Sequence, residues 1–298
     1  MKKQLLCLAV FALASVGHAM DSVEKQVLEL REQAKREGWH FKIGINPDMY
    51  LTDAERYCFK PGKDFGKDAP YVIPTRVGEL PKHWDWRDKG VVTGIKDQAY
   101  PVYCGSCWAF GTVAVLESII KIKTGREVHI SEQQLVSCRP SYGTCSGGNF
   151  AFGFYKQKGA NYPEDFPYVA DDVSCKDDAA QHEKVSSWGY VGQQGRGPSV
   201  DEIKAAIFKY GPVAATVSAS GAWSSYKGGL YDACNSNGTN HIIAIVGWDD
   251  DDEAWIVKNS HGEQWGDGGY IYMKWKGKNG NKCNNIGADA AFAVYTGG

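Results

Sequence analysis

The sequence has little net charge: 33 Lys and Arg residues stand against 35 Asp and Glu residues, and the formal net charge is -2. A surface that binds a polyanion needs a basic excess, so we expect no nucleic-acid partner. Long apolar runs are also scarce. Beyond the N-terminus no stretch approaches the ~20 apolar residues of a helical membrane span, and we expect no membrane association of the mature chain. Its length suits one large domain or two small ones.

The one long apolar run lies at the N-terminus. Lys2 and Lys3 precede apolar residues that continue to Val16, and small residues follow up to Ala19. This pattern is typical of a secretory signal peptide over residues 1–19. We therefore expect the secretory pathway, with an extracellular, periplasmic or lysosome- or vacuole-like destination. Nearly all of the nine cysteines lie beyond this segment, and secreted thiols tend to pair.

Residues 20–79 are polar and charged, and their composition differs from that of the aromatic-rich segment that follows. Apolar residues at helical spacing predict a helix over residues 22–37. The stretch 61–74 is rich in Pro, Gly and Lys, which is typical of an exposed linker open to proteolysis. We expect this segment to be an appendage of a main domain that spans residues 80–298.

The main domain has two halves of different character. Residues 106–123 contain no Pro and are mostly apolar, and Gly125 follows, which predicts a buried helix with a glycine stop. The C-terminal half has patterns typical of strands. These lie at residues 213–218, 241–248, 254–259, 269–275 and 291–295. A mainly helical half followed by a mainly antiparallel half predicts an α+β fold with a cleft between the halves.

The acidic run Asp249–Glu253 lacks the spaced ligands and central Gly of a calcium loop, so we interpret it as a solvated turn and expect no metal site. A hairpin that turns there pairs residues whose numbers sum to roughly 502. This pairing sets His241 opposite residues 259–261. His241 and Asn259 are therefore predicted neighbours.

Cys107 begins the predicted buried helix, three residues after Cys104. Three interpretations compete: both cysteines form disulfides with other residues, the pair is a redox centre, or Cys107 is a nucleophile. The positive end of a helix stabilises a thiolate, which favours reactivity.

A nucleophilic cysteine also needs a base. We expect Asn259 to accept the Nδ1–H of His241 and to hold the ring so that its other nitrogen faces Cys107. Alone, a histidine that begins an apolar strand is typical of a satisfied core residue. The cysteine and the asparagine at these separations favour a catalytic Cys-His-Asn set instead.

The run CGSCWAF at residues 104–110, with Cys145-Ser-Gly-Gly, Asn240-His241 and Asn259-Ser260, resembles the papain family of cysteine peptidases, with features of the cathepsin B and cathepsin X groups. The resemblance covers residue 80 to the C-terminus. It implies a left helical domain and a right antiparallel β-barrel-like domain with the active-site cleft between them. It also implies a monomeric zymogen that hydrolyses peptide or protein substrates without a cofactor and is inhibited by its own propeptide at residues 20–79.

The resemblance assigns further roles. Gln98 matches the family's oxyanion-hole glutamine, which acts with the backbone N–H of Cys107. Gly147 and Gly148 match the glycines along which a substrate backbone lies as an added strand. Trp265 matches the indole that shields the catalytic asparagine. The glycines and the tryptophan, each considered singly, also suit ordinary turn and core positions.

Two departures from the family pattern concern specificity. His261 replaces a tryptophan that follows the Asn-Ser pair; we interpret it as a neutral cleft-wall residue, with a second base as the alternative. The loop 99–103 has the length of the cathepsin X mini-loop, but Ala99 stands where that enzyme has its carboxylate-binding histidine. No charged anchor replaces it, which favours an endopeptidase over a carboxypeptidase of the cathepsin X type.

Asp289 aligns with the residue at the floor of the S2 pocket, which predicts acceptance of Arg at P2. The alternative is a solvated carboxylate on a terminal loop.

The family's cysteine pattern implies three disulfides, Cys104 with Cys145, Cys138 with Cys175, and Cys234 with Cys283. Cys58 lies in a segment similar to the cathepsin X segment whose cysteine bonds the catalytic one. Two alternatives follow: Cys58 bonds Cys107 in the zymogen, or the propeptide blocks the cleft without a covalent bond. Two other classes of function stay open: a thiol-disulfide oxidoreductase and a catalytically inert binding protein on the same scaffold.

Overall fold

A computed structural model describes residues 22–52, 59–60, 69–75, 78–176, 178–219, 221–235 and 238–297. The predicted signal peptide and Cys58 lie outside these residues. Within them, no helix combines the length and the apolar character that a bilayer crossing requires.

The helical half contains the predicted buried helix. The structure confirms it as α3 (Cys107–Thr124), which ends at Gly125 in the left-handed conformation, with φ 73°. Two shorter helices and a small two-stranded sheet accompany it. They are α4 (Glu132–Cys138), α5 (Phe152–Gln157), β3 (Gly143–Thr144) and β4 (Gly147–Gly148).

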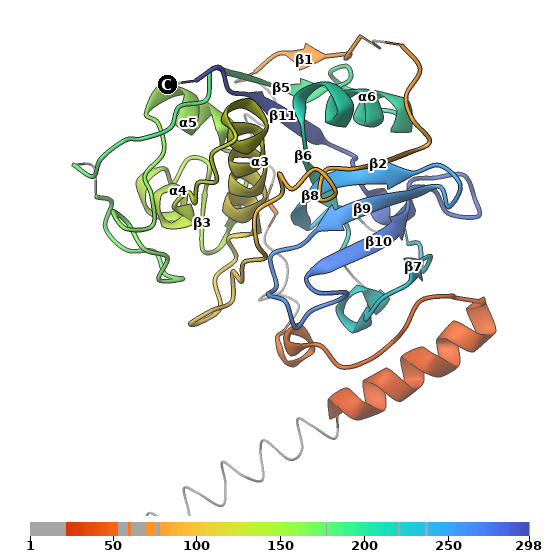
Figure 1. Cartoon of the computed structure of the whole chain (residues 1–298). Helices are drawn as coiled ribbons and strands as arrows, with labels where there is room; N and C mark the ends of the chain where they lie inside the picture. Colours follow the sequence, from red (N-terminus) through yellow and green to blue (C-terminus); the bar gives the residue numbers. More distant parts are fainter. Residues whose placement is uncertain are drawn as a thin grey trace, which may run out of the picture.

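The second half is one large, mostly antiparallel sheet (Figure 1). Its strands run in the order β1-β5-β11-β6-β8-β9-β10-β7, and β2 pairs with β8. Their bounds are β1 (Tyr71–Val72), β2 (His83–Asp85), β5 (Ser187–Val191), β6 (Val213–Val217), β7 (Leu230–Tyr231), β8 (His241–Asp249), β9 (Ala254–Lys258), β10 (Tyr270–Lys274) and β11 (Ala290–Val294). All five predicted strands are present, and α6 (Val200–Tyr210) packs beside β11. The predicted α+β class is confirmed.

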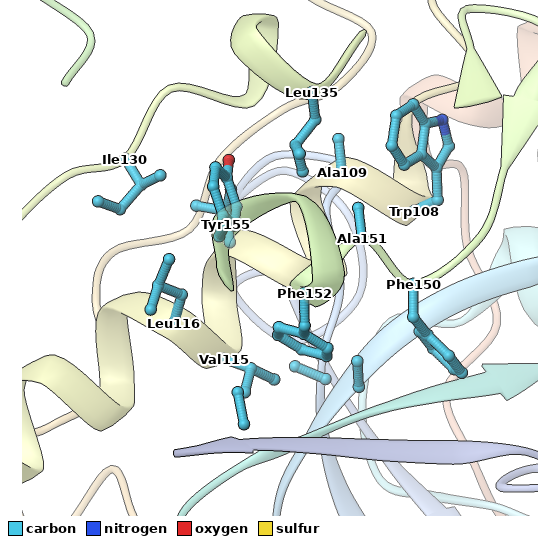
Figure 2. Packing of buried hydrophobic residues seen from close by; sticks show 14 of the residues in the cluster. Trp108, Ala109, Val115, Leu116, Ile130, Leu135, Phe150, Ala151, Phe152 and Tyr155 are labelled. Atoms are coloured by element: carbon cyan, nitrogen blue, oxygen red, sulfur yellow. The ribbon is translucent and has the colours of Figure 1, made fainter. Parts of the chain in front are cut away.

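Helix α3 lies between α4 and α5 on one side and the sheet on the other (Figure 1). Its apolar side chains pack on both sides, which explains why the segment is apolar nearly all round. Figure 2 shows Trp108, Val115 and Leu116 of α3 among residues of α4 and α5. On the sheet side, a Cβ at Gly111 would lie 2.6 Å from Cγ2 of Ile242 in β8. This close crossing fixes the N-terminal end of α3 next to the start of β8.

The segment before residue 80 is folded onto the main domain. Residues 22–37 are helical, as predicted. Phe41 is buried against Tyr226 and Tyr231 of the sheet half, with ring centroids 5.9 and 4.7 Å away. One expectation was wrong: part of the supposed linker, Tyr71–Val72, is strand β1 and pairs in parallel with β5. Its backbone hydrogen bonds to a distant strand outweigh the local composition, and residues 61–68 lie outside the described part.

The three predicted disulfides are all present: Cys104 with Cys145, Cys138 with Cys175, and Cys234 with Cys283. The first ties the loop before α3 to the loop that carries β4, and the third ties the segment after β7 to η3 (Cys283–Asn285).

Candidate active site

Cys107 is the first residue of α3 and is fully buried. The preceding residue, Ser106, does not cap the helix with its side chain; its hydroxyl lies 2.7 Å from the hydroxyl of Tyr168 instead. The positive end of α3 is therefore directed at the sulfur of Cys107, which would stabilise a thiolate once the sulfur is reduced.

In this structure the sulfur of Cys107 is oxidised. Cys107 is disulfide-bonded, and its partner lies outside the described residues. The six other cysteines of the described part are used by the three bridges given above. The redox interpretation that paired Cys104 with Cys107 is wrong, because Cys104 bonds Cys145.

The segment before residue 80, called the leader from here on, contacts both halves of the main domain next to His241. The N–H of Phe59 donates to the carbonyl of Asn240 over 2.8 Å, and the N–H of Lys60 donates to the carbonyl of Gly148 over 3.2 Å. Asn240 belongs to the sheet half and Gly148 to the helical half. The two leader residues therefore bridge the two halves at the level of His241.

His241 and Asn259 are neighbours, as predicted. In the β8–β9 hairpin Ala244 pairs with Lys258 and Ile245 with Val257, the expected register, and a bulge shifts the pairing farther from the site. One detail was wrong: Nε2 of His241, not Nδ1, lies 2.8 Å from Oδ1 of Asn259. The amide oxygen accepts, so Nε2 carries the proton. Nδ1 is buried and has no hydrogen-bond partner among the described residues, which leaves it available to a reacting group.

The ring of His241 is enclosed on all sides. It is fully buried, and the rings of His261 and Trp223 lie 5.0 and 6.2 Å away. Burial lowers the pKa of His241 to about 3; the neighbouring His261 also lowers it, while the hydrogen bond to Asn259 raises it. The imidazole is therefore neutral in this closed form.

Gln98 is hydrogen-bonded to Ser260, the residue that follows Asn259. Its N–H donates to the carbonyl of Ser260 over 2.9 Å, and its Oε1 accepts from the hydroxyl of Ser260 over 2.8 Å. Its Nε2 lies 3.3 Å from the carbonyl of Cys104. With Oε1 fixed by Ser260, the amide nitrogen is turned toward the loop that leads to Cys107. Its role as an oxyanion donor stays a prediction.

Gly147 and Gly148 form β4, and space for a side chain is missing at Gly148. A Cβ on Gly148 would lie 2.5 Å from the carbonyl oxygen of Tyr142 and 2.7 Å from the ring of Trp108. Phe59 of the leader pairs with Gly148 as a parallel bridge. The glycine edge thus accepts an extended chain, as a substrate-binding edge would.

Trp265 is fully buried, 5.9 Å from the ring of His261 and 5.3 Å from that of Trp223. The rings of Trp223 and His261 therefore lie beside His241, and Trp265 packs against both of them. Its role as the indole that shields Asn259 stays a prediction. The sequence did not single out Trp223, because a lone tryptophan in a loop has no distinctive spacing.

Asp289 lies apart from these residues. It lines a cavity of about 240 Å³ with Tyr71 of the leader, Tyr190 and Arg196. Burial raises its pKa and the nearby Lys282 lowers it. Its contact with a substrate residue stays a prediction.

The sequence of residues 80–294 matches the papain family cysteine protease. The chain belongs to this family. Among its relatives, the thiol protease SEN102 of Hemerocallis sp. is 38% identical over 276 residues, which are 86% of this chain and 74% of the relative. Ananain of Ananas comosus is 35% identical over 250 residues, covering 80% of this chain and 70% of ananain.

The papain-family fold is shared with solved precursor structures. Procathepsin L2 from the larval midgut of Tenebrio molitor superposes with a TM-score of 0.78 at 28% identity, covering 92% of this chain and 93% of its own. The recombinant stem bromelain precursor gives a TM-score of 0.80 at 29% identity, covering 94% and 91%. These likenesses cover more of this chain than residues 80–294, so they extend into the leader.

Proposed function

We propose that Cys107, His241, Asn259 and Gln98 carry out the peptidase reaction of this papain-family protein. In the processed, reduced enzyme the proton of Cys107 passes to Nδ1 of His241, and the resulting thiolate attacks the carbonyl carbon of the scissile bond. The observation that carries the proposal is the orientation of His241: Asn259 binds Nε2, so Nδ1 is the nitrogen left for the thiol.

The remaining steps use the same groups. The side-chain amide of Gln98 and the N–H of Cys107 stabilise the negative oxygen of the tetrahedral intermediate. The proton on Nδ1 of His241 then goes to the leaving amine as the C–N bond breaks, and a thioester forms. His241 next takes a proton from water, the hydroxide attacks the thioester, and the acid product leaves as Cys107 is restored.

The chain is proposed to be made as a secreted zymogen, with a signal peptide at residues 1–19, an inhibitory propeptide at 20–79 and the peptidase domain at 80–298. The leader residues Phe59 and Lys60 support this, because they fill the edge at Gly148. We propose Cys58 as the bonding partner of Cys107, since it directly precedes Phe59. Three disulfides suit an oxidising destination, extracellular, periplasmic or lysosome- or vacuole-like.

Endopeptidase action is proposed as the main activity, and a carboxypeptidase of the cathepsin X type is the second candidate. The loop 99–103 bears on this choice. Tyr100 and Val102 in it are 73% and 56% exposed, and the loop contains no His, Lys or Arg that would hold a terminal carboxylate.

A peptide-library digest tests the proposal. The purified chain is reduced and processed, incubated with the library, and the products are read by mass spectrometry, with Cys107→Ser as the matched control. Cuts within peptides, absent from the control, are expected. Removal of single C-terminal residues would favour the second candidate. Equal products from both proteins, or reduction of insulin disulfides without peptide cleavage, would contradict the peptidase assignment of these residues.

A further inference from the structure

A buried carboxylate of the leader faces a buried histidine beside the candidate catalytic pair. Oδ2 of Asp48 lies 3.4 Å from Nδ1 of His261, and the two side chains are 5% and 7% exposed. Within the described part of the chain, neither oxygen of Asp48 has a hydrogen-bond partner. A buried carboxylate is costly unless a positive group compensates it, so His261 is the group that accommodates Asp48.

The other charged and titratable groups near His261 come from three segments of the chain. Lys227 lies on the same side, where its Nζ donates to the carbonyl of Gln264 over 2.8 Å and to Oδ1 of Asn46 over 3.1 Å. Asp97 pairs with His261 through an isolated backbone β-bridge, and its carboxylate would repel a second carboxylate placed close to it. His241 lies 5.0 Å away and is neutral in this closed form.

The position of His261 relative to the reaction follows from the proposed mechanism. His241 protonates the leaving amine, so the residues after the scissile bond leave along the wall that continues from His241. His261 is the neighbouring ring on that wall. The strand edge at Gly148 is a different contact site from His261. The leader contacts Gly148 through Phe59 and His261 through Asp48.

We propose that His261 is a carboxylate-recognition residue on the leaving-group side of the cleft. Asp48 occupies it in the proform, and a substrate carboxylate takes its place after processing. The carboxylate belongs either to an Asp or Glu side chain just after the scissile bond or to the free C-terminus of the substrate. This inference rests on the proposed function and names the substrate class that the site selects.

The contact with Asp48 distinguishes a His261 that binds a carboxylate from a His261 that only lines the site as an uncharged side chain. The family resemblance puts a tryptophan at this position, and an indole has no charge with which to bind a carboxylate. A neutral wall residue would need an apolar side chain from the leader opposite it. The leader instead places the short acidic side chain of Asp48 there, at the turn η1 (Pro47–Tyr50).

Matched peptides test the substrate side. One pair carries Glu or Gln directly after the scissile bond with an amidated C-terminus, and a second pair ends one residue after the bond as a free acid or an amide. Because a single such ion pair is worth about one order of magnitude in kcat/KM, we expect a ratio of about tenfold in favour of the acid in at least one pair. His261→Trp should bring that ratio close to one. Ratios near one in the unaltered enzyme, or ratios that His261→Trp leaves unchanged, would overturn the inference.

A leader experiment tests recognition without peptidase activity. In the full-length Cys107→Ser chain, hydrogen exchange of residues 41–50 reports how often the leader opens. We expect Asp48→Asn to speed this opening about tenfold when His261 is present, and to slow it or leave it unchanged in His261→Trp, where the carboxylate has lost its partner. Equal effects in both backgrounds would overturn the inference. A chain that cuts none of the peptides would contradict the proposed function, and hydrogen exchange would still decide the role of His261.

Discussion

The Nε2 of His241 lies 2.8 Å from Oδ1 of Asn259, and this contact determines which nitrogen of the ring is left for chemistry. Strand β8 carries the histidine and the residue after β9 carries the asparagine, so the hairpin register holds them together. His241 and Asn259 are both buried, and the ring of Trp223 lies 6.2 Å from that of His241, so the contact is shielded from water, which strengthens it.

Removal of this contact should slow the reaction without weakening substrate binding. We expect Asn259→Ala to lower kcat about 100-fold, because the imidazole is no longer held in the required tautomer, and to change KM little. Steady-state kinetics on one peptide measures both constants. The exposed Asn279→Ala serves as the control and should behave like the unaltered enzyme. A rise in KM with kcat unchanged would contradict the positioning role.

Gln98 and Ser260 offer a matched pair of variants. Gln98→Ala removes the proposed oxyanion donor and should lower kcat about 100- to 1,000-fold, or ~3 to 4 kcal/mol of barrier. Ser260→Ala removes the same hydrogen bond between the two side chains but leaves the donor in place, and should cost less than tenfold. Single-turnover kinetics separates the two variants. Similar losses of kcat in the two variants would show that the hydrogen bond to Ser260, and not the amide donor of Gln98, supports the reaction.

The stability of the proform should fall in acid because of His241. Burial lowers the pKa of this ring from 6.5 to about 3, so the folded form holds it neutral while the unfolded chain binds a proton. The stabilising effect of the neutral ring is present above about pH 6.5 and is lost at up to about 1.4 kcal/mol per unit as the pH falls toward 3. Urea unfolding at several pH values measures this slope. His241→Gln should reduce it, and an identical slope in the variant would contradict the account.

A buried charge network links helix α3 to the segments around Lys96 and Ile130. The carboxylate of Glu117 in α3 is fully buried and accepts from Nζ of Lys96 over 2.7 Å, from the N–H of Ile130 over 2.8 Å and from the hydroxyl of Thr93 over 2.5 Å. Glu117→Ala removes one of the two carboxylates that pair with the buried Lys96. We expect a loss of about 3–5 kcal/mol in the free energy of unfolding. The control is Glu127→Ala, which breaks a more exposed ion pair and should cost less than about 1 kcal/mol.

Asp289 is predicted to favour Arg at the P2 position of the substrate. Asp289→Ala should lower kcat/KM for a P2 Arg peptide about tenfold and leave a P2 Phe peptide nearly unchanged, because only the cation loses its partner. Lys282 competes for the same carboxylate, and burial lowers its pKa to about 8, so the preference should be larger above that pH. Equal losses on both peptides would remove the prediction.

Local patterns were sufficient to predict much of the fold and part of the site. The continuous apolar content and Gly125 predicted α3, and the turn at the acidic run predicted that His241 meets Asn259. The family resemblance, and not local patterns, supplied the three disulfides.

The remaining features depend on contacts between distant residues. Which ring nitrogen of His241 meets Asn259 depends on the side-chain rotation, which strand pairing does not determine. Strand β1 is only two residues long and exists because β5 offers it hydrogen bonds. The contact between Asp48 and His261 joins two residues that are far apart in the sequence. A single Asp belongs to no sequence pattern from which its partner could be predicted.

The most direct test of the central claim labels the sulfur of Cys107. The reduced, processed enzyme is treated with an epoxide-type thiol inhibitor, with and without substrate, and the adduct is located by mass spectrometry. The account predicts one adduct per chain, on Cys107, whose formation parallels the loss of peptidase activity and is slowed by substrate and by His241→Ala. Full activity after complete labelling of Cys107, or inactivation with the adduct on another residue, would contradict it.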